Sequence, residues 1–216
     1  PTVGKLKNEK ATVVKKDIEK AKKLLDEEGY KDVDGDGLRE DNKGNKLVFN
    51  FAFQGGNNYD QALADTFIKS WKEVGLDVKL ADGKLMSSKD WTQRVTSDDP
   101  SIDLFQGAWS LGTNPNPARL LSDKAKVNYQ RYMSDVLKKD LETINSKEML
   151  DDAKRKEAYK KFDKDFAEEA AWLPFSWSTD ITWVNKRIKN FDVKKYAYGE
   201  QKLYALELTN KDSAKG

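Results

Sequence analysis

A regular alternation of strand-like and helix-like segments over residues 47–109 constrains the fold of this 216-residue chain more than any other feature. Residues 47–53 alternate apolar and polar side chains, and the apolar face consists of Leu47, Phe49, Phe51 and Phe53. A two-residue period of this kind is typical of a strand with one buried face. We therefore expect a strand that ends at the Gly55-Gly56 pair.

A helix is predicted to follow over residues 59–74, ended by Gly75, with inward positions at Ala62, Phe67, Ile68 and Trp71. Residues 76–80 and 102–109 predict two more strands, and a helix capped by Ser87 or Ser88 lies between them. Strands that alternate with helices predict parallel pairing through right-handed crossovers. The expected fold class is α/β, a mixed sheet with flanking helices.

The rest of the chain predicts further helices and a few strands. Helical spacing of apolar residues predicts helices over residues 15–28, 133–144 and 152–171. Apolar runs predict strands over residues 172–177, 181–184 and 203–208, with a basic turn over residues 186–190.

The absence of histidine and cysteine limits the chemistry that this chain can perform. A Ser-His-Asp or Cys-His arrangement is impossible within it, and a zinc site would need carboxylates alone. Paired carboxylates remain, but adjacent carboxylates on a helix point apart and do not form a catalytic dyad. The 6 Trp, 8 Tyr and 9 Phe favour a recognition surface over an enzyme.

Charge and hydropathy bear on two further kinds of partner. Charged residues make up 35% of the chain, with a net charge of only +2 and both signs interspersed. Nucleic-acid binding would need basic residues concentrated on one face, so no nucleic-acid partner is expected. No stretch approaches the roughly 18 apolar residues of a membrane span. Because the chain opens on Pro1 without a signal peptide, we expect a piece of a longer product.

Residues 32–40 match the beginning of a calcium-binding loop. Aspartates stand at the first, third and fifth positions, Gly37 at the sixth and a glutamate at the ninth, so the candidate metal ligands are Asp32, Asp34, Asp36 and Glu40. Lys43 occupies the twelfth position, where a bidentate glutamate belongs. The alternative is a tight turn whose aspartates accept hydrogen bonds from their own backbone. Calcium is the one candidate cofactor.

Residues 104–121 predict a ligand contact. A predicted strand ends at Trp109, and a loop rich in Gly, Asn and Pro follows. Ligands of open α/β sheets gather beyond the strand ends, so Trp109 is a candidate for a peptide or sugar contact. The alternative is that Trp109 fills the core, because tryptophan is highly buried on average.

Three segments taken together resemble the extracellular oligopeptide-binding proteins of ABC peptide importers, in particular the Gram-positive lipoprotein type. They are Asp-Val-Asp-Gly-Asp-Gly-Leu-Arg-Glu at residues 32–40, the segment over residues 104–121, and Trp-Leu-Pro-Phe-Ser-Trp at residues 172–177. The helix that ends in Leu-Leu-Asp-Glu-Glu-Gly-Tyr before the Asp/Gly loop fits as well. The resemblance covers nearly the whole chain, in order.

The resemblance implies one lobe of a two-lobed receptor with a type II periplasmic-binding-protein-like fold. Residues 1–185 correspond to the C-terminal, peptide-contacting lobe, and residues 186–216 to a terminal segment that returns toward the N-terminal lobe. It also implies an oligopeptide ligand, the membrane permease subunits of an ABC importer as partners, a monomer, and no enzymatic activity. The implied location is the outer face of a Gram-positive cell membrane, through a lipid anchor upstream of Pro1.

Individual residues carry over as candidate liners of the peptide cleft: Trp91, Gln106, Trp109, Gly112, Asn114, Asn116, Arg131, Tyr132 and Trp177. In enteric relatives of the family, the third residue after the tryptophan that corresponds to Trp109 is an aspartate that pairs with the peptide's free amine. Gly112 stands at that position here. The resemblance therefore implies binding through main-chain hydrogen bonds and side-chain pockets, without a charge clamp from this position.

Other functions remain open alongside this one. A receptor of the same fold could take a dipeptide, a signalling peptide, a nickel complex or an oligosaccharide, because fold does not determine ligand. A carboxylate-based hydrolase is an alternative of a different class. A single lobe holds half a cleft, so we expect weak or no peptide binding by this chain alone.

Overall fold

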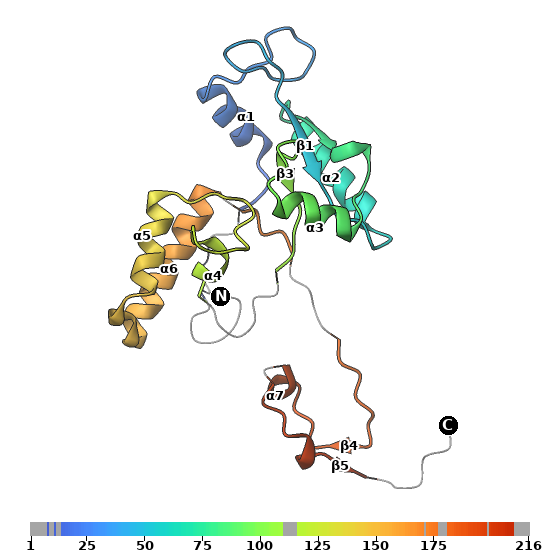
Figure 1. The fold of residues 1–216 in the computed structure, drawn as a ribbon, viewed down its shortest axis with the longest axis vertical. Coiled ribbons are helices and arrows are strands. Elements are labelled where there is room, and N and C mark those ends of the chain that lie inside the picture. Colours follow the sequence, from blue (N-terminus) through green and yellow to red (C-terminus); the bar gives the residue numbers. More distant parts are fainter. Residues whose placement is uncertain are drawn as a thin grey trace. The chain divides into compact units, whose positions relative to one another are not determined.

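The computed structural model describes residues 8, 11, 14–109, 116–170, 172–176, 181–197 and 199–209 (Figure 1). The described residues form two compact units. The first unit contains those up to Trp172, and the second contains those from Leu173 onward.

A three-stranded parallel sheet forms the centre of the first unit. Its strands are β1 (Val48–Ala52), β2 (Asp77–Leu80) and β3 (Leu104–Phe105), in the order β2-β1-β3. Phe51 of β1 lies opposite Leu80 on one side and Leu104 on the other, and both pairings are parallel. The predicted parallel arrangement is confirmed. The third strand is shorter than residues 102–109, because its partner β1 ends at Ala52, whose carbonyl accepts the Gln106 N–H at 2.9 Å.

One face of the sheet packs against α2 (Asp60–Lys72), which connects β1 to β2. Phe51 and Phe53 point to this face and pack with the helix residues Ala64, Phe67, Ile68 and Trp71. The prediction that Ala62 faces inward is wrong: Ala62 is exposed and Ala64 is fully buried. The reason is that Ala64, three residues before Phe67, lies on the same helical stripe as the aromatic residues.

The other face of the sheet packs against α3 (Ser88–Thr96), through Trp91 and Val95. Ala52 points to this face, as strand alternation requires for the residue between Phe51 and Phe53. Ser87 caps α3, as predicted, and its hydroxyl oxygen accepts the Asp90 N–H at 3.1 Å. A 3-10 turn, η1 (Ala81–Gly83), leads from β2 toward α3.

The Asp/Gly loop connects α1 (Ile18–Glu27) to β1 and is tied down by Arg39. The Arg39 guanidinium is almost buried, donates to the Val74 carbonyl at 2.8 Å, and pairs with Asp26 of α1 at 2.6 Å. α2 ends at Lys72, two residues before the predicted end, and Gly75 lies in the turn that follows, with φ +87°. A Cβ at Gly75 would lie 2.8 Å from Cγ of Arg39. The conformation of Gly75 and the position of Arg39 therefore depend on each other.

A helical hairpin completes the first unit. It consists of the short α4 (Ala118–Leu121), α5 (Asp135–Ile144), the 3-10 turn η2 (Lys147–Leu150) and α6 (Asp152–Glu169). Its core contains Leu121, Leu137, Leu141, Ile144, Tyr159 and Phe162. The two long helices confirm the predictions for residues 133–144 and 152–171. None of the described helices is long and apolar enough to cross a bilayer.

The second unit contains β4 (Ile188–Lys189), α7 (Val193–Ala197), the 3-10 turn η3 (Leu203–Ala205) and β5 (Glu207–Leu208). β4 and β5 pair in antiparallel fashion. The strands predicted over residues 172–177 and 181–184 are absent at residues 172–176 and 181–184, because no described strand pairs with them. The strand predicted over residues 203–208 is reduced to β5, since β4 offers only two residues for pairing.

Candidate functional site

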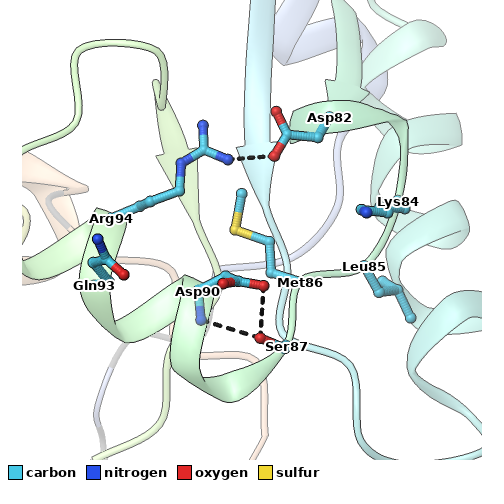
Figure 2. A pocket seen from close by; sticks show the side chains of 8 residues that line it. All are labelled: Asp82, Lys84, Leu85, Met86, Ser87, Asp90, Gln93 and Arg94. Carbon is cyan, nitrogen blue, oxygen red and sulfur yellow. Dashed lines mark hydrogen bonds and ion pairs between the residues drawn. The ribbon is translucent and has the colours of Figure 1, made fainter.

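The carboxyl edge of the parallel sheet carries the candidate site. A bridge between Gln54 and Met86 extends the pairing past the ends of β1 and β2, and Gly55 N donates to the Met86 carbonyl at 2.9 Å. Beside it lies a pocket of about 500 Å³, lined by Asp82, Lys84, Leu85, Met86, Ser87, Asp90, Gln93 and Arg94 (Figure 2). A pocket beyond the carboxyl ends of parallel strands lies where open α/β sheets bind ligands.

The pocket is polar and its charges are balanced. Asp82 and Arg94 form an ion pair across it, and the Ser87 hydroxyl donates to Asp90 at 2.7 Å (Figure 2). Arg94 Nε also donates to Asp99 at 2.6 Å, and this hydrogen bond raises the pKa of the guanidinium. A lining of paired acids and bases suits polar ligand groups and water better than a large apolar side chain.

A group of aromatic rings begins at Trp91 of α3. Trp91 packs edge-to-face on Phe105 at 5.9 Å and on Tyr129 at 6.5 Å, between ring centroids. Tyr129 in turn lies 5.2 Å from Trp109, and Trp109 stacks on Trp172 at 5.9 Å with an interplanar angle of 12°. We call Trp91, Phe105, Tyr129, Trp109 and Trp172 the aromatic cluster. It joins the sheet to the helical hairpin, where Trp172 also contacts Phe166 at 6.0 Å.

Both predicted tryptophans belong to the aromatic cluster, but they differ in exposure. Trp91 is buried, and its indole Nε1 has no hydrogen-bond partner among the described residues. Trp109 is only half-buried, so part of its ring remains open while two other rings support it. An indole that is fixed by stacking and partly exposed is suited to contacting a ligand.

The other candidate liners in the described part of the chain have contacts within the protein. Gln106 is half-buried and directly follows β3. Asn116 donates to the Asn145 side chain at 2.7 Å, and its oxygen accepts the Ala118 N–H at the start of α4. The Tyr132 hydroxyl hydrogen-bonds Glu169 at 2.5 Å, which raises the tyrosine pKa. The side chains of Asn116 and Tyr132 thus hold helices in position.

The Arg131 side chain binds the C-terminal end of α3. Its guanidinium donates to the Val95 carbonyl at 3.2 Å and to the Thr96 carbonyl at 3.4 Å, and pairs with Asp98 at 3.2 Å. A cation at the C-terminus of a helix is favoured by the helix dipole. The remaining candidate liners, Gly112, Asn114 and Trp177, lie outside the described residues.

The Asp/Gly loop has the hydrogen bonds expected of a tight turn. Asp32 accepts the N–H groups of Gly35 at 2.7 Å and Gly37 at 2.9 Å, and Asp34 and Asp36 each accept an N–H two residues ahead. Lys46 pairs with Asp34 at 3.2 Å and with Asp36. The hydrogen bond to Asp36 raises the pKa of the Lys46 ammonium and lowers the pKa of Asp36.

The lining of the pocket was not predicted from the sequence. Its charged residues Asp82, Lys84, Asp90 and Arg94 directly follow β2 or lie on α3. The signal that pointed to Trp109, a position just beyond the end of a parallel strand, applies equally to residues 81–87.

The fold and this edge define a class: one lobe of a type II periplasmic binding protein. The family model for bacterial extracellular solute-binding proteins, family 5 Middle, matches residues 1–130. The chain belongs to this family of solute-binding proteins.

Within this family, the chain is similar in sequence to curated oligopeptide-binding proteins. The chain is 35% identical over 176 residues to the oligopeptide-binding protein OppA of Lactococcus lactis, a match that covers 81% of this chain and 29% of the relative. It is 29% identical over 137 residues to the oligopeptide-binding protein AppA of Bacillus subtilis, covering 59% of this chain and 24% of the relative. The chain thus spans less than a third of the length of these relatives.

Solved structures agree with the fold. Lactococcal OppA, complexed with an endogenous peptide in the closed conformation, matches with a TM-score of 0.72 and 30% identity, covering 77% of this chain and 31% of that one. AppA from Bacillus subtilis, in complex with a nonapeptide, matches with a TM-score of 0.68 and 22% identity, covering 78% and 33%. NikZ from Campylobacter jejuni, in complex with Ni(L-His), shares the fold with a TM-score of 0.62 and 20% identity, covering 78% and 34%.

Proposed function

We propose that this chain is the peptide-contacting lobe of an extracellular receptor that captures oligopeptides and delivers them to an ABC importer. The observation that carries the proposal is the 35% identity to lactococcal OppA over 81% of the chain. The half-buried Trp109 and the polar pocket, both at the carboxyl edge, supply the two kinds of surface that such a ligand needs. Main-chain hydrogen bonds and water-filled pockets hold an extended peptide with little regard to its sequence.

The organisation of the complete receptor is part of this proposal. Residues 1–185 form the lobe, and residues 186–216 return toward a second lobe, which closes over the peptide by a hinge motion. The receptor acts as a monomer, is held on the outer face of a Gram-positive cell membrane by a lipid anchor, and meets the importer's permease subunits there. It performs no catalysis. By itself, the chain holds half of the cleft and binds peptide weakly or not at all.

A comparison of two tryptophan-to-phenylalanine variants tests the role of Trp109. Trp109→Phe in the complete receptor shrinks the supported, half-exposed ring at the carboxyl edge, and we expect peptide affinity to fall about tenfold. Trp71→Phe is the matched control, since Trp71 packs on the opposite face of the sheet with α2. Titration calorimetry with an oligopeptide measures both. Equal affinities for wild type and Trp109→Phe would contradict a ligand contact by Trp109.

Gly112 provides a second test, which asks whether the receptor recognises the free amine of the peptide by charge. The proposal predicts that the wild-type receptor binds a peptide and its N-acetylated form with similar affinity, because no carboxylate stands at this position. Gly112→Asp supplies that carboxylate and is expected to favour the free amine, since an ion pair with a desolvated amine adds affinity. A wild-type receptor that rejects the acetylated peptide would show that the amine is clamped by another residue.

The second candidate is a receptor of the same fold for another solute. NikZ with Ni(L-His) and the binding protein MelB of Agrobacterium fabrum with stachyose, at 18% identity and a TM-score of 0.56, show that the fold accepts such ligands. Competition between the oligopeptide and stachyose or nickel–histidine for the complete receptor distinguishes the candidates.

A further inference from the structure

The loop between α1 and β1 gathers carboxylates at one point. Asp32, Asp34 and Glu40 each place one carboxylate oxygen so that these three oxygens lie within 4.8 Å of one another. Calcium–oxygen distances are about 2.3–2.6 Å, so two oxygens on one calcium ion lie no more than about 5 Å apart. The three carboxylates are therefore close enough to share one ion.

The loop backbone has the turn that such a site requires. Gly37, at the sixth position counted from Asp32, has φ +88°, a left-handed conformation that glycine adopts without strain. Calcium loops place glycine at their sixth position for this sharp turn. The Gly37 N–H donates to Asp32 at 2.9 Å and fixes the first carboxylate against the turn.

The buried carboxylate of Glu40 provides an independent observation that points to a cation site. It is only 4% exposed, and its Oε2 atom accepts the Val33 N–H at 2.8 Å. Its Oε1 atom is buried and has no hydrogen-bond partner among the residues that the structure describes. The ammonium of Lys46 approaches Oε1 only to 3.8 Å, too far for a hydrogen bond. A buried carboxylate oxygen without a close partner is costly, and a cation at bonding distance would remove that cost.

Lys46 already brings a positive charge to this cluster. Its ammonium pairs with Asp34 at 3.2 Å and with Asp36, in addition to its longer contact with Glu40. One lysine thus faces three carboxylates from different positions of the loop. This arrangement places a monovalent charge beside a cluster whose carboxylates together can balance a divalent ion.

We propose that this loop binds a calcium ion, with Asp32, Asp34, Asp36 and Glu40 as ligands, and that the ion displaces the Lys46 ammonium. The exchange leaves Glu40 Oε1 bound to the ion and the lysine in solvent. Because Lys43 stands where a bidentate glutamate would complete the site, the affinity falls in the weak range of extracellular modules, with Kd of about 10⁻⁴–10⁻³ M. This site is separate from the peptide site and does not depend on the proposed function.

Titration calorimetry with calcium chloride on the full chain, in metal-free buffer, tests the proposal. We expect saturable binding by the wild type and about tenfold tighter binding by Lys46→Gln, which removes the competing ammonium. Glu40→Gln keeps an acceptor for the Val33 N–H but loses the anionic oxygen, so it should abolish binding. Asp41→Asn is the matched control, because Asp41 is in the same loop but, among the described residues, its carboxylate accepts hydrogen bonds from Lys43 and Asn45 and lies outside the cluster. Its affinity should match the wild type within about twofold.

Three results would overturn the proposal. The first is no saturable binding by either wild type or Lys46→Gln up to about 10 mM calcium, a concentration well above the weak range. The second is equal binding by Glu40→Gln and wild type. The third is equal affinity for magnesium, which prefers six ligands at shorter distances and would indicate general charge screening. Thermal unfolding of each variant, which should show a wild-type transition in the absence of calcium, establishes that every variant is folded.

Discussion

The two compact units differ in what holds them together. The first unit has three clusters of buried apolar side chains, two on the faces of the sheet and one in the helical hairpin. None of the described residues of the second unit is buried, and Trp183, Tyr204 and Ile181 are 92%, 83% and 74% exposed. Apolar burial is the main force that offsets the conformational entropy lost on folding. The first unit therefore has its own source of stability, whereas the described residues of the second unit show no comparable core.

The largest expected effect on the free energy of unfolding comes from removing the buried ring of Phe53. Phe53 is 1% exposed, and Phe53→Ala should lower the free energy of unfolding by about 3–5 kcal/mol through lost burial and a cavity. Trp183→Ala removes a larger side chain from the second unit but should change it by less than about 0.5 kcal/mol. Urea unfolding of the chain measures both. Similar losses for the two variants would break the distinction between the units.

The next largest effect on stability is expected from a substitution at one of two glycines, one in each unit. Gly75 in the first unit and Gly199 in the second have φ +87° and +69°, so alanine strains the backbone at either position. Only at Gly75 would the new Cβ also meet a neighbour, Cγ of Arg39 at 2.8 Å. Gly75→Ala should destabilise the chain by about 1–3 kcal/mol. Gly199→Ala should leave the main unfolding transition in place, and a clear shift of that transition would assign the second unit to the same cooperative fold.

The smallest expected effect is on the pH dependence of the stability, through Asp99. Hydrogen bonds from Ser101, and then from Arg94, lower the pKa of Asp99 in the folded first unit to about 2. A lowered pKa contributes stability above the unfolded value of about 3.9, and that stability is lost as the pH falls toward 2. Asp99→Asn should make the loss of stability between about pH 4 and pH 2 less steep.

Asp192 in the second unit is the comparison for Asp99. Its pKa is also lowered, mainly by the Lys195 N–H. Asp192→Asn should nevertheless leave the pH dependence of the main transition unchanged, because the second unit contributes little to that transition. Unfolding curves recorded across the acidic range decide the point, and equal changes from Asp99→Asn and Asp192→Asn would count against it.

The sequence predicted best where local pattern and packing agree. The alternation of Phe49, Phe51 and Phe53, the turn at Gly75 and the cap at Ser87 are local signals, and each appears in the first unit. The same kind of apolar run predicted strands over residues 172–177 and 181–184. A strand needs a partner, and residues 173–176 and 181–184, which have no strand partner among the described residues, are exposed and irregular.

The candidate site was predicted only in part, for a similar reason. Trp109 follows from the rule that ligands meet open sheets at the carboxyl edge, whereas Trp91 was predicted only through the family resemblance; both lie in the aromatic cluster. The pairing of Arg94 with Asp82 and the position of Lys46 among the loop carboxylates depend on tertiary geometry. No spacing rule in the sequence connects those residues, so the polar pocket and the lysine within the acidic loop emerged from the structure.

Mass spectrometry of the ligands that co-purify with the complete receptor tests the central claim most directly: that the self-stabilised first unit presents a peptide-binding surface. The account predicts a mixture of peptides of varied sequence from the wild type and a strongly reduced yield from Trp109→Ala, with the yield from Trp71→Phe unchanged. An oligosaccharide or a nickel complex in place of peptides, or equal peptide yields from wild type and Trp109→Ala, would contradict it.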